Sequence, residues 1–390
     1  MSPPVLRGAA SGAAALPHAQ AGARAQTRRL TVINGRFLEQ RLTGVQRYAW
    51  EMVQALDGVL AELARAGNAW PVELHAPPGA RDLPGLRHIR LRFTGMHTGH
   101  AWEQIDLPRS AWGALLVGFG NTGPLLHRRQ IVTLHDAGIY AVPDAYSRPF
   151  RAWYRLLYPV LGRRALKVLT VSRFSAMELS LYTGLRRAKF AVVPNAADHF
   201  LSLTPAPDTL ARHGLDPGRY VFAIGSAARH KNLAVLARAL AQIEGPKPLL
   251  VTAGHKDPRL FGQVADVAGE GVRELGAVSD GDLKALYQNA LCLVFPSTYE
   301  GFGLPPLEAM AAGCPVIVSQ AASLPEVCGE AALYCDPHSP ADIAARIARL
   351  RDDPDLRTEL IALGAERVRQ FGWRRNAERL MQVLEEVSGR

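Results

Sequence analysis

The sequence "LCLVFPSTYEGFGLPPLEAMAAGCPVIVS" fills residues 291–319. It starts and ends with short, continuous apolar runs of the kind that form strands buried on both faces. Between them a helix is expected to begin near Pro305 or Pro306, because proline suits the first helical turn. Gly313 and Pro315 are expected to end it. The stretch therefore predicts a strand, a loop, a helix and a second strand, which is the repeating unit of a parallel sheet.

The same alternation of apolar runs and helical patterns extends over most of the chain. Strands are expected at residues 30–35, 72–77, 88–93, 114–119, 130–136, 167–172, 190–196, 220–226 and 248–254. Helices are expected at residues 44–67, 149–165 with a break at Pro159, from 173 onward, 231–243, 280–290 and 371–387. The fold class is therefore α/β, with two doubly wound domains that face each other. In such folds ligands bind at the carboxyl ends of the strands, so a cleft between the domains is the expected site.

A proline-rich, polar segment at residues 201–218 separates the two series of elements and is predicted to be a linker. It divides the chain into a first domain at residues 30–200 and a second at residues 219–371. Residues 1–29 are rich in Ala, Gly, Pro and Arg and lack the continuous apolar core of a secretory signal. We expect a disordered leader there, or a mis-assigned start codon.

Basic residues are concentrated in the first half of the chain. Residues 1–200 hold 25 lysines and arginines against 12 aspartates and glutamates, whereas residues 201–390 hold 20 against 23. The candidate partners for such a basic half are nucleic acid, an anionic lipid surface or phosphorylated small molecules. Arginine enrichment through genome bias is the alternative that needs no partner.

The four cysteines are expected to be reduced, buried thiols, because none forms a C-x-x-C pair or has a nearby histidine at ligand spacing. The cysteines are Cys292, Cys314, Cys328 and Cys335. No apolar run approaches the roughly 18 residues that a membrane-spanning helix needs.

Three short motifs imitate cofactor sites. "GFGNTG" at residues 118–123 matches a dinucleotide fingerprint, but Pro124 and then a strand follow it where a helix would be needed. The D-x-D motifs at residues 280–282 and 353–355 could hold a metal. Ser279 and Asp282 fit a helix N-terminus better, as cap and first-turn acid. No metal site is predicted at either motif.

The opening stretch also carries the chemistry of a binding site. Glu300 lies in the loop after the first strand, and Glu308 is expected in the first turn of the helix. Gly301 and Gly303 allow backbone N–H groups to approach a ligand closely, and a helix N-terminus favours a phosphate. The carboxylates can accept hydrogen bonds from hydroxyls. A diphosphate between two polyhydroxylated rings, as in a nucleotide sugar, fits this arrangement.

The chain resembles the retaining GT-B glycosyltransferases of family 4, group 1, in the mannosyltransferase-like style. The resemblance rests on E-x7-E at residues 300–308, followed by "GCPVIVS" and "SLPEVCGEAALYCDP" up to residue 337. Further motifs occur in the family's order over roughly residues 30–385: "TGVQRYAWEMVQAL", "TLHDAGIY", "VSRFSAMELS", "VVPNAAD", "IGSAARHKNL" and "LGAVSDGDLKALY". The resemblance implies two Rossmann-like domains across a cleft, with the last helix, residues 372–388, packed back on the first domain.

The resemblance also implies roles for two acids, two bases and a histidine. Glu308 matches the acid that holds the ribose hydroxyls of the nucleotide, and Glu300 the acid that faces the donor sugar. Arg229 and Lys231 match the basic pair on the diphosphate, where fixed cations stabilise the charge that grows as the glycosidic bond breaks. His135 matches the histidine near the donor sugar, with a capping role at the strand end as the alternative.

Backbone groups of the donor site are implied in the same way. The matching loop positions are Gly301, Phe302, Gly303 and Leu304, whose backbone meets sugar and phosphate. Gly44 matches the first-loop glycine near the phosphate, although many relatives have two glycines where this chain has Thr43 and Gly44. The base is expected to be read by backbone groups near Val278. Asp136, beside the candidate histidine, is a further candidate.

The expected reaction is metal-independent transfer of a hexose with retention, with no cofactor beyond the nucleotide-sugar substrate. Mannose or rhamnose from a GDP-sugar is the favoured donor, and a lipid-linked, polysaccharide or lipopolysaccharide precursor is the favoured acceptor. Residues 148–173 combine basic and aromatic side chains and contain no acid. This segment predicts contact with an anionic membrane surface and a peripheral place at the inner face of the cytoplasmic membrane of a cytoplasmic protein. A cleft-lining role for these arginines is the alternative.

Two other functions stay open at this stage. A sugar-nucleotide hydrolase or epimerase shares the architecture but normally lacks E-x7-E. A non-catalytic sugar-nucleotide or RNA-binding module is suggested by the high isoelectric point of about 9.7. RNA modules would show aromatic-bearing strands or a GXXG clamp, and neither signal is convincing in this chain, so no nucleic-acid partner is expected.

Overall fold

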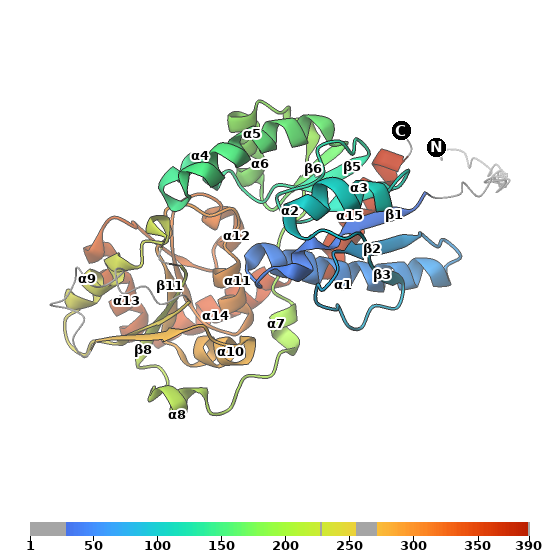
Figure 1. Cartoon of the computed structure of the whole chain (residues 1–390). Coiled ribbons are helices and arrows are strands. Elements are labelled where there is room, and N and C mark those ends of the chain that lie inside the picture. The colour runs from blue at the N-terminus through green and yellow to red at the C-terminus, as the bar shows by residue number, and fades with distance from the viewer. Residues whose placement is uncertain (1–28, 227, 255–270, 389–390) are drawn as a thin grey trace, which may run out of the picture.

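The described residues of the computed structural model, 29–226, 228–254 and 271–388, form two parallel sheets with helices packed on them (Figure 1). The predicted disordered leader, residues 1–29, lies outside the described residues except for Arg29. The predicted α/β class with two doubly wound domains is confirmed. The predicted domain limits at residues 200 and 219 stay a prediction.

The first sheet has the strand order β3-β2-β1-β4-β5-β6-β7, and every neighbouring pair is parallel. Its strands are β1 (Thr31–Asn34), β2 (Val72–Ala76), β3 (Ile89–Phe93), β4 (Leu115–Gly118), β5 (Gln130–Thr133), β6 (Lys167–Thr170) and β7 (Phe190–Val192). The strand order reverses between β1 and β4, which is where ligands bind in doubly wound folds.

The second sheet has the order β10-β9-β8-β11-β12-β13, again with parallel pairs. Its strands are β8 (Tyr220–Ile224), β9 (Leu249–Ala253), β10 (Val272–Gly276), β11 (Cys292–Phe295), β12 (Val316–Ser319) and β13 (Leu333–Cys335). The sequence predicted only the four central strands. The edge strands β10 and β13 are partly exposed and so lack the continuous apolar pattern of a strand buried on both faces.

The helices between residues 35 and 202 belong to the part of the chain that forms the first sheet. They are η1 (Gly35–Glu39), α1 (Gly44–Arg65), α2 (Gly99–Ala101), η2 (Trp102–Asp106), α3 (Leu107–Ser110), α4 (Gly138–Ala141), η3 (Pro143–Ala145), α5 (Arg148–Arg164), α6 (Arg173–Thr183), η4 (Arg187–Lys189) and α7 (His199–Ser202). The segment predicted as a linker ends in the short helix α8 (Thr209–His213) and a turn.

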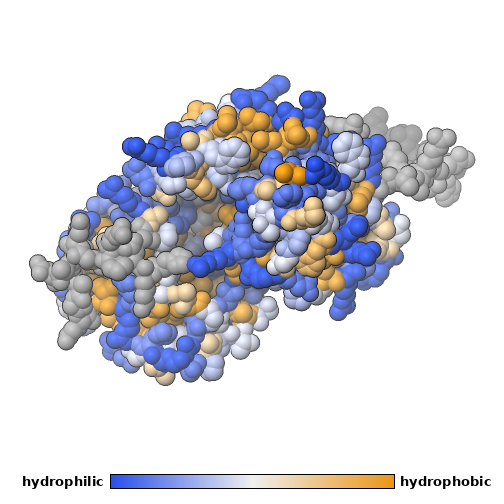
Figure 2. Space-filling view, in the orientation of Figure 1, coloured by the Kyte–Doolittle hydropathy of each residue, from blue (hydrophilic) through white to orange (hydrophobic). Residues whose placement is uncertain are grey.

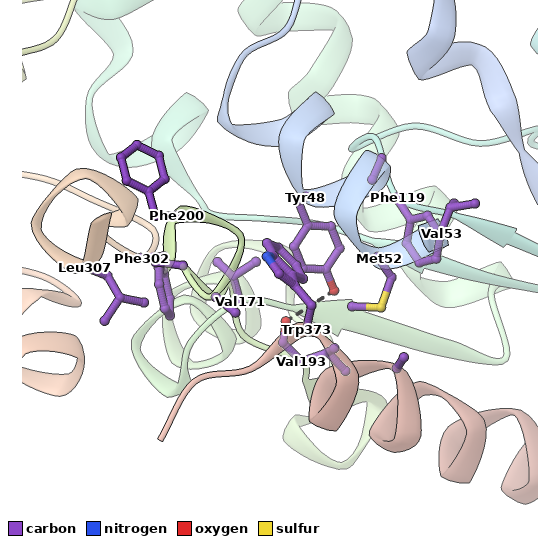
Figure 3. Close-up of a cluster of buried hydrophobic side chains, with 14 of the residues drawn as sticks. Tyr48, Met52, Val53, Phe119, Val171, Val193, Phe200, Phe302, Leu307 and Trp373 are labelled. Atoms are coloured by element: carbon purple, nitrogen blue, oxygen red, sulfur yellow. Dashed lines mark hydrogen bonds between the residues drawn. The ribbon is translucent and has the colours of Figure 1, made fainter. Parts of the chain in front are cut away.

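The remaining helices follow β8 along the chain. They are η5 (Arg229–Lys231), α9 (Ala234–Ala241), α10 (Asp280–Asn289), α11 (Leu304–Ala311), α12 (Leu324–Cys328), α13 (Pro340–Asp352), α14 (Pro354–Val368) and α15 (Trp373–Ser388). Of these, α15 leaves the second sheet and packs along α1 under the first (Figure 1). The Trp373 ring lies 5.7 Å from the ring of Tyr48, and the two side chains join one apolar core that reaches Phe302 and Leu307 of the second domain (Figure 3).

The motifs that imitate cofactor sites have structural explanations. No helix occurs between β4 and β5, where a dinucleotide site would need one. Ser279 and Asp282 form a capping box at the start of α10, and the Asp353 side chain caps α14. All four cysteines are buried and free, as predicted.

The predicted helix break at Pro159 is wrong, because α5 runs through that residue without interruption. Proline cannot donate to the carbonyl four residues earlier, which is that of Arg155. The hydroxyl of Tyr140 donates to this carbonyl instead, at 3.2 Å. A hydrogen bond from a neighbouring helix therefore replaces one that proline removes, and a single sequence gives no sign of it.

We predict that Tyr140→Phe lowers the free energy of unfolding by about 1 kcal/mol, because the carbonyl of Arg155 loses its donor. In a Pro159→Ala background the backbone N–H at position 159 can supply the bond, so the same substitution should cost less. Denaturant unfolding of the two single variants and the double variant measures this coupling. Equal costs in both backgrounds would refute the compensation.

Candidate active site

A cleft of about 530 Å³ lies between the two domains at the carboxyl ends of their strands. It brings together most of the residues that the sequence selected. These are Gly44, His135, Asp136, Lys231, Val278, Glu300, Gly301, Phe302, Gly303, Leu304 and Glu308. Arg229 is not among the lining residues. It borders a separate hollow of about 300 Å³, beside His230 and His338, so the structure does not join the two bases of the predicted pair in one cavity.

The loop between Glu300 and Gly303 is packed so closely that two of its positions accept only glycine. A Cβ at Gly301 would lie 2.7 Å from the Cβ of Asp136, and Gly303 has a φ of +101°, which side chains rarely adopt. Ser323 anchors the loop, because its hydroxyl donates to the carbonyls of Glu300 and Phe302 at 2.9 and 2.8 Å. The N-terminus of α11 therefore opens directly into the cleft.

The first domain holds the same loop from the other side. The hydroxyls of Ser172 and Ser175 donate to the carbonyl of Gly301 at 2.7 and 2.9 Å. The carboxylate of Glu326 in α12 accepts from the backbone N–H groups of Arg173 and Phe174 at the start of α6. These contacts cross between the domains, so they fix the two walls of the cleft relative to each other.

Among the residues that the structure describes, Lys231 is one of two cations that line the cleft, and Arg47 is the other. Its Nζ lies 2.6 Å from Oε1 of Glu300 and 5.3 Å from the centre of the Phe295 ring. The next residue, Asn232, has a φ of +54°, and its side chain donates to the carbonyl of Pro337 at 2.6 Å. An ammonium held near a helix N-terminus forms a site that favours an anion.

His135 is buried and neutral. Burial lowers its pKa to about 4. Its Nε2 lies 2.8 Å from the carbonyl of Phe119, which can only accept, so the ring proton sits on Nε2 and Nδ1 keeps a lone pair. Asn121, whose φ is +61°, accepts from the backbone N–H of His135. Next to it, burial and the charge of Glu300 raise the pKa of Asp136, whose Oδ1 accepts from Gly138.

Glu308 is the fifth residue of α11, so the expectation that it lies in the first turn is wrong. The helix starts at Leu304, earlier than the prolines suggested. Burial raises the pKa of Glu308 to about 8, with Arg47 acting against the rise and Asp280 and Glu51 adding to it. The described residues offer its carboxyl no hydrogen bond, and Nε2 of His199 lies 3.8 Å from its Oε1.

Sequence reasoning missed several residues of this site. Arg47 binds both oxygens of Asp280 at 2.6 Å, and both residues line the cleft, although the sequence pattern marked Asp280 only as part of a D-x-D motif for which no metal site is predicted. His199 lies beside Glu308. Arg47 falls inside the motif TGVQRYAWEMVQAL and Asp280 inside LGAVSDGDLKALY, and this is the only sequence signal that could have marked them. His199 directly follows the motif VVPNAAD.

Two facing parallel-sheet domains with a cleft between them form the GT-B fold, and solved structures with that fold match. A sucrose-phosphate synthase from Thermosynechococcus elongatus is 22% identical, with a TM-score of 0.70 over 92% of this chain and 99% of that one. HepE from Anabaena, in complex with UDP and glucose, is 17% identical, with a TM-score of 0.71 over 92% of this chain and all of the other. At these identities the likeness concerns the fold.

The family follows from the sequence comparisons. The model described as "Glycosyl transferases group 1" matches residues 209–367, and "Glycosyltransferase Family 4" matches residues 42–199. The O-antigen chain mannosyltransferase B of Escherichia coli is 31% identical over 85% of this chain and 93% of that protein. The O-antigen chain mannosyltransferase RfbU of Salmonella typhimurium is 31% identical over 63% of this chain and 70% of that one. The chain therefore belongs to group 1 of glycosyltransferase family 4 and is a glycosyltransferase.

Two features bear on metals and membranes. Within the described ranges, no cluster of three or more His, Cys, Asp or Glu side chains forms a possible metal site. None of the helices that the structure describes combines the length and the apolar character needed to cross a bilayer.

We predict that Gly301→Ala lowers the free energy of unfolding by about 1–3 kcal/mol, because the added Cβ collides with the Cβ of Asp136 and the carbonyl of His135. Transfer activity should fall with it, since the loop forms one wall of the cleft. Gly44→Ala is the matched control, because a Cβ there meets nothing within 4 Å. Equal stability of the two variants in denaturant unfolding would contradict the packing argument.

Proposed function

We propose that this enzyme transfers mannose, with rhamnose as the second candidate, from a GDP-sugar to a lipid-linked or polysaccharide precursor. The observation that carries the proposal is the shared cleft of Lys231, Glu300 and Glu308 beside the N-terminus of α11. A cation and the positive end of the α11 dipole suit a diphosphate, and carboxyls suit the hydroxyls of ribose and hexose. The choice of mannose is supported by the two relatives named as O-antigen mannosyltransferases.

The roles in the reaction follow from the charges of the cleft. As the bond between the hexose and the diphosphate breaks, negative charge grows on the phosphate, and Lys231 with the α11 N-terminus stabilises it. Lys231 is paired with Glu300 in the structure, so a bound diphosphate would compete for this cation. Neutral His135 can accept a hydrogen bond from a hydroxyl of the hexose at Nδ1. Arg229 borders the neighbouring hollow. It would serve as a second cation for the diphosphate when its loop turns toward the cleft.

Retention and metal independence are part of the proposal. Lys231 and the helix end supply positive charge that a divalent cation would otherwise bring. Transfer on the front face of the sugar would let the leaving phosphate take the proton of the acceptor hydroxyl, with no carboxylate nucleophile on the opposite face. Membership in a family of transferases favours this reaction over the two alternatives from the sequence, which were hydrolysis or epimerisation of a nucleotide sugar and non-catalytic binding.

A peripheral position at the inner face of the cytoplasmic membrane is proposed through residues 148–173. Helix α5 exposes Phe150, Trp153 and Leu156 at 41%, 43% and 63% of their surface, and Met177 and Leu181 of α6 are also exposed. Figure 2 shows hydrophobic residues gathered along the edge of the molecule where Figure 1 places α5 and α6. Seven basic residues and no acid lie between residues 145 and 177. Apolar side chains among arginines suit an anionic bilayer.

We predict that GDP-mannose raises the melting temperature of the wild type by several degrees, because a ligand at a hundred times its Kd adds about 2.7 kcal/mol. Glu308→Ala should lose much of that gain, since its carboxyl is the proposed ribose partner. A thermal-shift panel with GDP-rhamnose, UDP-sugars and dTDP-sugars measures the base and sugar preference. A panel without any shift would refute the donor site.

EDTA should leave turnover unchanged, and NMR of the product should show an α-linkage.

We predict that the wild type floats with vesicles that contain anionic phospholipid at low salt and is released at high salt. The double variant Trp153→Ser/Leu156→Ser should bind several-fold less, because it removes two exposed apolar side chains. Ile361→Ser in α14 is the matched control, as it removes an exposed apolar side chain of the second domain. Equal binding to neutral and anionic vesicles would contradict the proposed surface.

A further inference from the structure

His199 opens α7 and lies between Trp373 of α15 and Glu308 of α11. The indole N–H of Trp373 donates to Nδ1 of His199 at 3.2 Å. An indole nitrogen can only donate, so Nδ1 must hold the lone pair of the imidazole. The proton of the neutral ring therefore sits on Nε2. Figure 3 shows Trp373 at the start of α15, where that helix meets α1.

The Nε2–H group of His199 is buried and has no hydrogen-bond partner in the part of the chain that the structure describes. Oε1 of Glu308 lies 3.8 Å away, which is too long for a hydrogen bond. Burial also lowers the pKa of His199 to about 4, so the ring is a neutral donor at physiological pH. Unpaired buried donors are rare in folded proteins, and this one is directed at the acid of the proposed donor site.

We propose that His199 is a positioning residue for Glu308, whose carboxylate takes the Nε2–H hydrogen bond when a nucleotide sugar occupies the cleft. The inference rests on the proposed function and adds a residue outside the motifs that define it. The ribose supplies two hydroxyl donors to the carboxylate, and His199 supplies a third. All three donors favour the ionised form of Glu308. Occupancy of the site then satisfies both the unpaired histidine and the buried acid.

Other charged and titratable groups face Glu308 from two helices. Arg47 and Glu51 project from α1, and Asp280 and Tyr287 belong to α10. Arg47 favours the ionised carboxylate, whereas Glu51 and Asp280 disfavour it. These groups stay in place when only His199 is changed. A difference in pH dependence between variants of His199 therefore reports on the histidine.

The sign of the pH effect follows from the raised pKa of Glu308. The free site holds this acid protonated below about pH 8, and the bound nucleotide sugar favours its ionised form, so nucleotide binding releases a proton. Affinity should therefore rise with pH toward 8. Removing the histidine donor weakens the ionised complex most. The loss of affinity should be large at pH 8 and smaller at pH 5.5, where more of the complex keeps Glu308 protonated.

Calorimetric titration of GDP-mannose into the full-length wild type, His199→Phe and His199→Gln tests this inference. We expect His199→Phe to lose at least about tenfold in affinity at pH 8, as for a hydrogen bond to a charged group, and clearly less at pH 5.5. His199→Gln keeps an N–H donor and should recover most of the loss. In a Glu308→Gln background, His199→Phe should show no difference between the two pH values.

Two outcomes would overturn the inference and are distinguishable. An equal loss at both pH values, or a His199→Gln variant as weak as His199→Phe, means that the ring only fills space, and the proposed donor site survives. If the wild type binds none of the nucleotide sugars of the panel, the donor site itself fails and the role of His199 fails with it. Circular dichroism of each variant shows whether a loss of affinity comes from unfolding. If His199→Phe is unfolded, the affinity of His199→Gln decides whether the N–H donor is needed.

Discussion

The carbonyl of Gly301 is held by two serine hydroxyls of the opposite domain, while its Cα lies against Asp136 with no room for a side chain. The rest of the site depends on this contact. Because the loop is pressed against the first domain, Glu300 and the start of α11 face the end of β5, where His135 is located. Each sheet alone would offer only half of a binding surface.

Three polar features dominate the electrostatics of the cleft. Lys231 is paired with Glu300, Glu308 is buried without a hydrogen bond from the described residues, and the Nε2–H of His199 is unpaired. Burial raises the pKa of one acid and lowers the pKa of the histidine for the same reason, since a low-dielectric surrounding disfavours either charge. A ligand with a diphosphate and two sugar rings would supply the missing partners. The proposed nucleotide sugar has this composition.

The return of α15 to the first domain connects folding to the site. Trp373, its first residue, packs against Tyr48 in the core (Figure 3). It also donates to His199 beside the cleft. The carboxylate of Asp198 accepts from the backbone N–H of Trp373, which fixes the start of the helix next to α7. The two places where the chain crosses between domains therefore meet near Glu308. Movement of one domain against the other would therefore change the surroundings of Glu308.

The sequence by itself determined the α/β class, the central strands and the E-x7-E loop, because continuous apolar runs and glycine or proline punctuation are local properties. It did not reveal the edge strands β10 and β13, whose partial exposure weakens the apolar pattern, nor the continuation of α5 through Pro159, which depends on Tyr140. Only the tertiary structure paired Arg47 with Asp280, 233 positions apart, and placed His199 beside Glu308. It also separated Arg229 from Lys231, two positions away, because a 3-10 turn directs neighbouring side chains to different hollows. Such pairings depend on how the domains pack against each other, and the spacing of residues along the chain does not reveal that packing.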